Sequence, residues 1–117
     1  MLDTVTIQRF ENALPIGFSA LKELAINMAS EGMSQAAICH AFDSFGRYLR
    51  DTGRDQFERG VIGVSIECIV GDKSRDSWWF NHYLTQEEFD EYRRTIGAPL
   101  RTIFHFDGQS HVNKPDA

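Results

Sequence analysis

The stretch VIGVSIECIV, residues 61–70, decides the fold class because its apolar residues fit two different periods. Every second residue is apolar and many are β-branched, which is typical of a strand. Phe57, Val61, Val64 and Cys68 also recur at helical spacing, so the alternative is a helix over residues 57–70 and a mostly α-helical chain. The two glycines, Gly60 and Gly63, are unfavourable inside a helix. The pattern therefore favours the strand.

Before this stretch, the sequence predicts a short strand and two helices. Residues 4–10 begin with alternating β-branched residues, which indicates the strand. Gly32 should end the first helix, and Ser34 should be the N-cap of the second. Because the connection is short, the two helices should pack as an antiparallel pair. Their apolar faces recur at intervals of three and four, with Phe18, Leu21, Leu24, Ala25 and Met28 on the first and Ile38, Ala41, Phe42, Phe45 and Leu49 on the second.

After residues 61–70, a polar turn and an extended aromatic segment over residues 77–84 predict a β-hairpin. A helix should follow over residues 86–96, because Thr85 and Glu88 have the spacing of a capping box. Gly97 and Pro99 should end this helix.

The C-terminal part alternates over residues 100–107, which predicts a last strand, and residues 108–117 are expected to form a flexible tail. The expected order is β-α-α-β-β-α-β, an α+β fold with an antiparallel or mixed sheet and helices on one face. A length of 117 residues indicates a single domain, residues 1–117, with one hydrophobic core.

Charge and cysteine content restrict the partners and the compartment. A net charge of −5 argues against nucleic acid or an anionic membrane as the main partner, and it suits a protein with a basic face. Cys39 and Cys68 are too few and too far apart for a disulfide framework. The charged N-terminal residues do not resemble a signal peptide, and no stretch has the length of a membrane span. We therefore expect a cytoplasmic protein.

Histidine supplies the first candidates for chemistry. His105 and Asp107 lie two apart on the expected last strand, so they share a face, and His82 could join them from the hairpin. An imidazole beside a carboxylate can bind a ligand or act as a base, which makes a small enzyme or ligand-binding domain one alternative. No nucleophile or oxyanion motif accompanies them, so a binding protein is favoured over an enzyme. The His and Cys spacing fits neither a zinc site nor any cofactor.

A second alternative is a helix-turn-helix regulator built from residues 21–47. A recognition helix needs side chains that reach bases and phosphates, yet no Lys or Arg occurs between Lys22 and Arg47. An ordinary helical hairpin explains this segment better, so nucleic-acid binding is disfavoured.

The leading hypothesis rests on the aromatic segment and the helix after it. In a strand, Trp78 and Trp79 would point to opposite faces, which would leave one of them exposed as an interface anchor. The expected partner-binding residues are Trp78, Trp79, Tyr83, Glu87, Glu88 and Glu91. The sequence thus predicts a small acidic protein-binding module, an inhibitor or immunity-type protein that blocks a basic nuclease, toxin or nucleic-acid-binding complex. Self-association to a homo-oligomer is left open.

Overall fold

The computed structural model describes residues 2–71 and 74–100, and these residues form helices and contain no strand. The α+β class and the order β-α-α-β-β-α-β are therefore wrong. Residues 57–70 are helical, as the alternative predicted, although Phe57 and Val64 of its expected apolar stripe are exposed. The elements are α1 (Thr4–Ala13), α2 (Phe18–Ser30), α3 (Gln35–Asp51), α4 (Gln56–Val70), a short 3-10 helix (Arg75–Ser77) and α5 (Gln86–Ile96).

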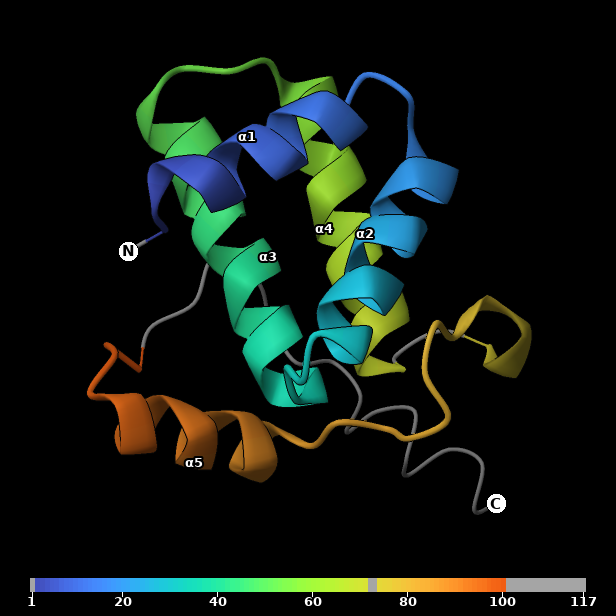
Figure 1. The fold of residues 1–117 in the computed structure, drawn as a ribbon, viewed down its shortest axis with the longest axis vertical. Coiled ribbons are helices and arrows are strands. Elements are labelled where there is room, and N and C mark those ends of the chain that lie inside the picture. The colour runs from blue at the N-terminus through green and yellow to red at the C-terminus, as the bar shows by residue number, and fades with distance from the viewer. Residues whose placement is uncertain (1, 72–73, 101–117) are drawn as a thin grey trace.

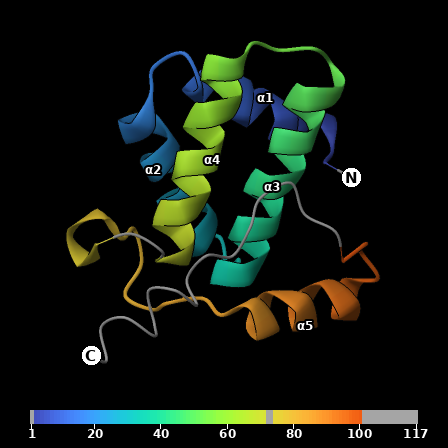
Figure 2. The ribbon, with the colours of Figure 1, turned by 180° about the vertical axis from the view of Figure 1, so that it is seen from behind.

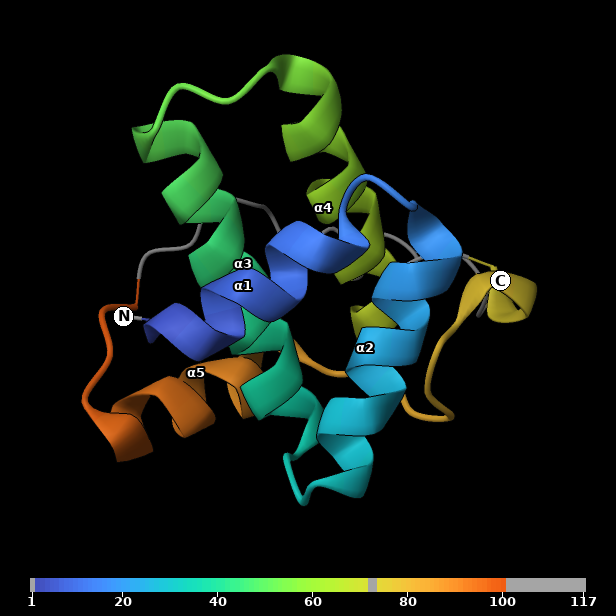
Figure 3. The same cartoon turned by 45° about the horizontal axis from the view of Figure 1, so that its top comes forward.

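The helices form one core around α3, which packs most extensively against α4 (Figure 1). α2 and α3 run antiparallel, as expected, and so do α3 and α4, which lie side by side when the molecule is seen from behind (Figure 2). α1 crosses α3 near one end of the bundle, and α5 lies across the other end (Figure 3). This arrangement leaves the first residues of the chain and the end of α5 on the same side of α3.

Residues 61–70 belong to α4 because the helix is buried on most of its circumference. Its buried residues are Val61, Ile62, Ser65, Ile66, Cys68, Ile69 and Val70. A helix enclosed on several sides needs apolar residues at nearly every position. Its sequence therefore also has an apolar residue at every second position, as a strand does. The Asp55 carboxylate caps the start by accepting the Glu58 N–H at 2.9 Å. A Cβ added to Gly60 or Gly63 would meet no atom within 4 Å, so these glycines serve no close packing.

The strand predicted over residues 4–10 is also wrong, since these residues begin α1. The Asp3 carboxylate accepts the Thr6 N–H at 2.7 Å and caps the helix. Phe10 is fully buried, with its ring stacked on Phe45 at 4.6 Å and edge-on to Phe42 at 4.8 Å. This packing outweighs the weak strand preference of the β-branched residues.

Residues 77–84 do not form the predicted hairpin strand, because their backbone bonds to the end of α4 instead. The Trp79 N–H donates to the Cys68 carbonyl at 3.0 Å, and the Leu84 N–H donates to the Val70 carbonyl at 2.8 Å. These bonds satisfy carbonyls that a helix end leaves free. Gly71 allows the turn between the two segments: its φ is +92°, and a Cβ there would lie 3.1 Å from the Trp78 ring.

The Gln35 side chain ties the same segment to α3. Its Nε2 atom donates to the Ile69 and the His82 carbonyl oxygens, each at 2.7 Å. The predicted last strand over residues 100–107 and the predicted tail over residues 108–117 lie, except for Leu100, outside the described residues.

The predicted helix ends are confirmed. Ser34 caps α3 by accepting the Ala37 N–H at 3.1 Å, and Gly32 has the positive φ of +101° that ends α2. Thr85 and Glu88 form the capping box of α5, with hydrogen bonds of 2.9 and 3.1 Å.

Replacing Thr85 with Ala should lower the free energy of unfolding by about 1 kcal/mol, because the Glu88 N–H then loses its acceptor. Thr4→Ala is the matched control, since Thr4 is exposed in the first turn of α1 and makes no side-chain hydrogen bond to the described residues. Urea denaturation of the two variants measures the difference. Equal midpoints would show that the capping box does not stabilise α5.

Candidate functional site: a pocket beside α3

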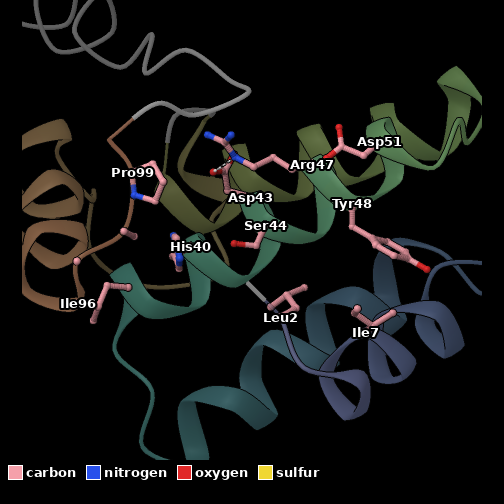
Figure 4. A pocket seen from close by; sticks show the side chains of 12 residues that line it. Leu2, Ile7, His40, Asp43, Ser44, Arg47, Tyr48, Asp51, Ile96 and Pro99 are labelled. Carbon is pink, nitrogen blue, oxygen red and sulfur yellow. Dashed lines mark hydrogen bonds and ion pairs between the residues drawn. The ribbon is translucent and has the colours of Figure 1, made fainter.

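A pocket of about 670 Å³ opens where the N-terminal residues, α3 and the end of α5 meet (Figure 4). This volume lies within the range of about 300–1,000 Å³ that is usual for small-molecule sites. Leu2 and Ile7 form one apolar wall, and Ile96 and Pro99 form the opposite wall. The residues between the walls come from α3: His40, Asp43, Ser44, Arg47, Tyr48 and Asp51.

The α3 side of the pocket is polar because residues three and four apart share one face of a helix. His40, Ser44 and Arg47 follow one another along this face, one turn apart (Figure 4). Ser44 makes no side-chain hydrogen bond within the described residues. The pocket therefore combines apolar walls with a row of groups that can still bond a ligand.

His40 is half-buried, and the ring lies 6.0 Å from Tyr92 and 6.4 Å from Phe89, centroid to centroid. Its Nδ1 atom is buried without a hydrogen-bond partner in the described part of the chain. Burial lowers the pKa of the imidazole below its usual value of 6.5, although the Asp43 carboxylate opposes this shift. At neutral pH the ring is therefore uncharged, and it can donate or accept a hydrogen bond.

Asp43 is the buried charge of the site, with 1% of its surface exposed. Its Oδ2 atom lies 3.4 Å from Nε of Arg47, one helical turn away. The guanidinium is thereby held at the rim of the pocket, while its two terminal nitrogens make no hydrogen bond to the described residues. A cation held in place with free donors is suited to binding an anion.

Arg93 supports the wall formed by the end of α5, although it does not line the pocket. Its side chain is 1% exposed and lies over the Phe89 ring, 4.5 Å from the centroid. One terminal nitrogen donates to the Pro99 carbonyl at 3.2 Å, and the other donates to Asp90. The Ala98 N–H donates to the Arg93 carbonyl at 2.9 Å. These bonds position residues 97–99 against α3.

The His40 environment predicts a pH dependence of stability. The unfolded chain binds a proton on this imidazole near pH 6.5, whereas the folded protein resists protonation until a lower pH. Stability contributed by the neutral ring is therefore complete above pH 6.5 and is lost as the pH falls through the folded pKa. His40→Gln should lose less stability than the wild type between pH 7.5 and pH 5.5 in urea denaturation. Equal losses of stability in the two proteins would contradict the lowered pKa of His40.

Four carboxylates with lowered pKa values do not obscure this comparison. The lowered pKa values of Asp3, Glu11, Glu31 and Glu88 start from usual values of 3.8 to 4.5, so these groups titrate below the window. The other histidines are present in both proteins, and their contributions cancel in the difference.

The predicted aromatic anchors lie apart from this pocket and are half-buried. Trp79 packs edge-on against Phe42, 6.2 Å between centroids, and so belongs to the edge of the core. Trp78 lies beside Gly71, with the Arg75 guanidinium 4.7 Å above its ring. Tyr83 packs against the core.

The acidic residues predicted to face a partner are exposed on α5, but two of the three have internal partners. Glu91 pairs with Arg94 at 3.1 Å. Glu88 serves the capping box and accepts a contact from His82 Nε2 at 3.0 Å, and the Thr85 backbone N–H, together with His82, lowers the pKa of its carboxyl. Only Glu87 makes no such contact within the described residues.

The predicted ligand set of His82, His105 and Asp107 is not tested by the structure, since the last two residues lie outside the described ranges. Among residues 2–71 and 74–100, no three His, Cys, Asp or Glu side chains are placed to hold a metal ion. None of the helices in these ranges is long and apolar enough to cross a membrane. α3, the expected recognition helix, is buried along most of its length, which argues against its insertion into a DNA groove.

The sequence analysis gave Asp43 and Arg47 no functional role. One signal was present, because His40, Ser44 and Arg47 fall on a single face beside the apolar stripe. The walls of the pocket, however, come from residues 2–7 and 96–99, and no local pattern indicates that these segments meet. Comparisons with family models, curated proteins and solved structures found no match to this chain.

Proposed function

We propose that this protein binds a small amphipathic molecule in the pocket beside α3. The observation that carries the proposal is a volume of about 670 Å³ between two apolar walls, combined with polar groups that have no hydrogen-bond partner among the described residues. Ligand sites are usually concave, mostly apolar and equipped with a few converging polar groups. His40 and Ser44 provide such groups on the floor, and Arg47 provides one at the rim.

Methyl NMR with a mixture of small aromatic acids, amides and amines tests this proposal. Bound fragments should shift the methyl signals of Leu2, Ile7 and Ile96, which line the pocket. Ile26 is the internal control, because it is about as exposed as Ile96 but does not line the pocket. Shifts spread equally over Ile26 and the pocket methyls would contradict a specific site.

A pocket-filling variant makes the test specific. Ser44→Phe should abolish the shifts, because the larger ring occupies the floor and the lost hydroxyl has no hydrogen bond to the described residues. Ser19→Phe, at an exposed position of α2, is the matched control and should bind as the wild type does. Circular dichroism of both variants verifies that the helices remain. Undiminished binding to Ser44→Phe would place the ligand elsewhere.

The second candidate is the acidic protein-binding module, an inhibitor of a basic nuclease, toxin or nucleic-acid-binding complex. A smaller hollow of about 270 Å³ supports it, because Trp78, Asp76, Phe18 and Val64 line this hollow together. Phe18 is 45% exposed. Lys22 also lines the hollow and Arg75 lies over the Trp78 ring, so the support comes from the partly exposed aromatic surface, which is typical of protein interfaces. Under this candidate, Trp78→Ala should weaken binding of the partner and Ser44→Phe should not, whereas the ligand proposal predicts no effect of Trp78→Ala.

A further inference from the structure

We propose that the ligand of this pocket carries a carboxylate on an apolar body, with the carboxylate bound by Arg47 and Ser44 and the body lying between Ile7 and Ile96. This inference rests on the proposed function, and it adds the chemical class of the ligand. It follows from the hydrogen-bond donors of the pocket that have no acceptor among the described residues.

Arg47 carries the argument for an anion. Only its Nε atom contacts Asp43, and at 3.4 Å this contact is long for a charged hydrogen bond. The terminal nitrogens present four N–H donors in one plane, which matches the two oxygens of a carboxylate. About a third of the side chain, 31%, is exposed, so a ligand can reach it without unfolding the helix.

Ser44 and His40 extend the row of donors inward. The Ser44 hydroxyl lies one turn before Arg47 on the floor of the pocket and has no partner among the described residues (Figure 4). The Nδ1 atom of His40 is buried, whereas the Nε2 atom is not. Because His40 lines the pocket, Nε2 can donate a hydrogen bond to a ligand there. A carboxylate accepts several hydrogen bonds, so it can accept from Ser44 and Arg47 together.

The two acids of the pocket do not favour an amine instead. Asp43 is 1% exposed and already faces the Arg47 cation, so a ligand cannot approach it freely. Asp51 lies at the outer rim, where 70% of its side chain is exposed and Arg50 lies 3.5 Å away. Exposed ion pairs of this kind contribute little in water. The accessible cation is therefore the dominant charge for a ligand that enters the pocket.

Three probes with the same apolar body separate the head-group classes: 4-phenylbutyrate, 4-phenylbutyramide and 4-phenylbutylamine. Isothermal titration calorimetry of the full chain at pH 7.5 should show the tightest binding for the carboxylate, by about tenfold or more over the amide, with the amine weakest. An amide or amine that binds as tightly as the carboxylate would overturn the carboxylate assignment while leaving a ligand pocket. Failure of all three probes to bind would overturn the proposed function itself.

Variants of Arg47 then test whether this residue binds the carboxylate. Arg47→Gln should weaken 4-phenylbutyrate binding by about tenfold or more and change amide binding by less than about threefold. Arg59→Gln is the matched control, because Arg59 is exposed on α4 and does not line the pocket; it should leave both affinities unchanged. If Arg47→Gln fails to fold, Arg47→Lys, which keeps the charge but not the planar fork, and Ser44→Ala should each selectively weaken carboxylate binding. Equal losses for carboxylate and amide, in whichever variants fold, would contradict the assignment.

Discussion

Replacing Phe10 with Ala should lower the free energy of unfolding by about 3–5 kcal/mol, the range observed when a buried aromatic ring is truncated. Phe10 is completely buried, and its ring contacts both Phe42 and Phe45 of α3. The variant loses the burial of the ring and leaves a cavity between α1 and α3. The effect should therefore reach beyond α1 and weaken the central helix.

Urea denaturation followed by circular dichroism measures this change. Val5→Ala is the matched control, because Val5 lies on the same helix with 70% of its surface exposed, and it should change stability by less than about 0.5 kcal/mol. A Phe10→Ala variant as stable as Val5→Ala would mean that α1 does not pack on α3 as described.

Arg93→Ala is expected to cost about 3 kcal/mol or more, since truncating this fully buried side chain leaves a cavity and removes the donor of two hydrogen bonds. Asp90 would lose its cation and the Pro99 carbonyl would lose its donor, while a cavity would open over the Phe89 ring. Arg93→Met keeps most of the volume without the charge, so it should cost less than half as much. Equal costs for the two variants would show that the lost polar contacts alone, and not the lost volume, set the cost.

The same pair of variants links stability to the pocket. Arg93→Met should stay folded but hold residues 97–99 less firmly, because the bond to the Pro99 carbonyl is absent. We therefore expect weaker 4-phenylbutyrate binding in Arg93→Met than in the wild type. Calorimetry of the folded variant measures this, and unchanged affinity would separate Arg93 from the ligand site.

Local signals in the sequence predicted the helix ends well, because capping chemistry depends on neighbouring residues only. Ser34 and the Thr85–Glu88 box lie where the sequence places them. The apolar stripe of α3 was also correctly predicted, since one face of that helix is buried and the other carries polar residues. These features required no knowledge of distant parts of the chain.

Predictions for α1 and α4 failed because tertiary packing decides both. α4 is enclosed on several sides, so its apolar residues no longer mark a single face, and β-branched residues such as Ile66 imitate a strand. The β-branched start of α1 is similarly overridden by the burial of Phe10. The backbone of residues 77–84 hydrogen-bonds to the end of α4. The local sequence pattern of such a segment is the same as that of a hairpin strand, so the sequence alone does not distinguish the two.

The pocket was missed for a related reason. The polar row of α3 is visible in the sequence, but a solvated face and a ligand site have the same local pattern. Only the fold shows that Leu2 and Pro99, almost a hundred residues apart, enclose that row. Candidate sites formed by segments that are distant in the sequence therefore require the structure.

The most direct test of the ligand-binding account is a nuclear Overhauser measurement on the complex with 4-phenylbutyrate. The account predicts contacts from the phenyl protons to the methyl groups of Leu2, Ile7 and Ile96, all of which line the pocket. Contacts to the Val64 methyls and the Phe18 ring instead would place the ligand in the hollow beside Trp78 and contradict the account.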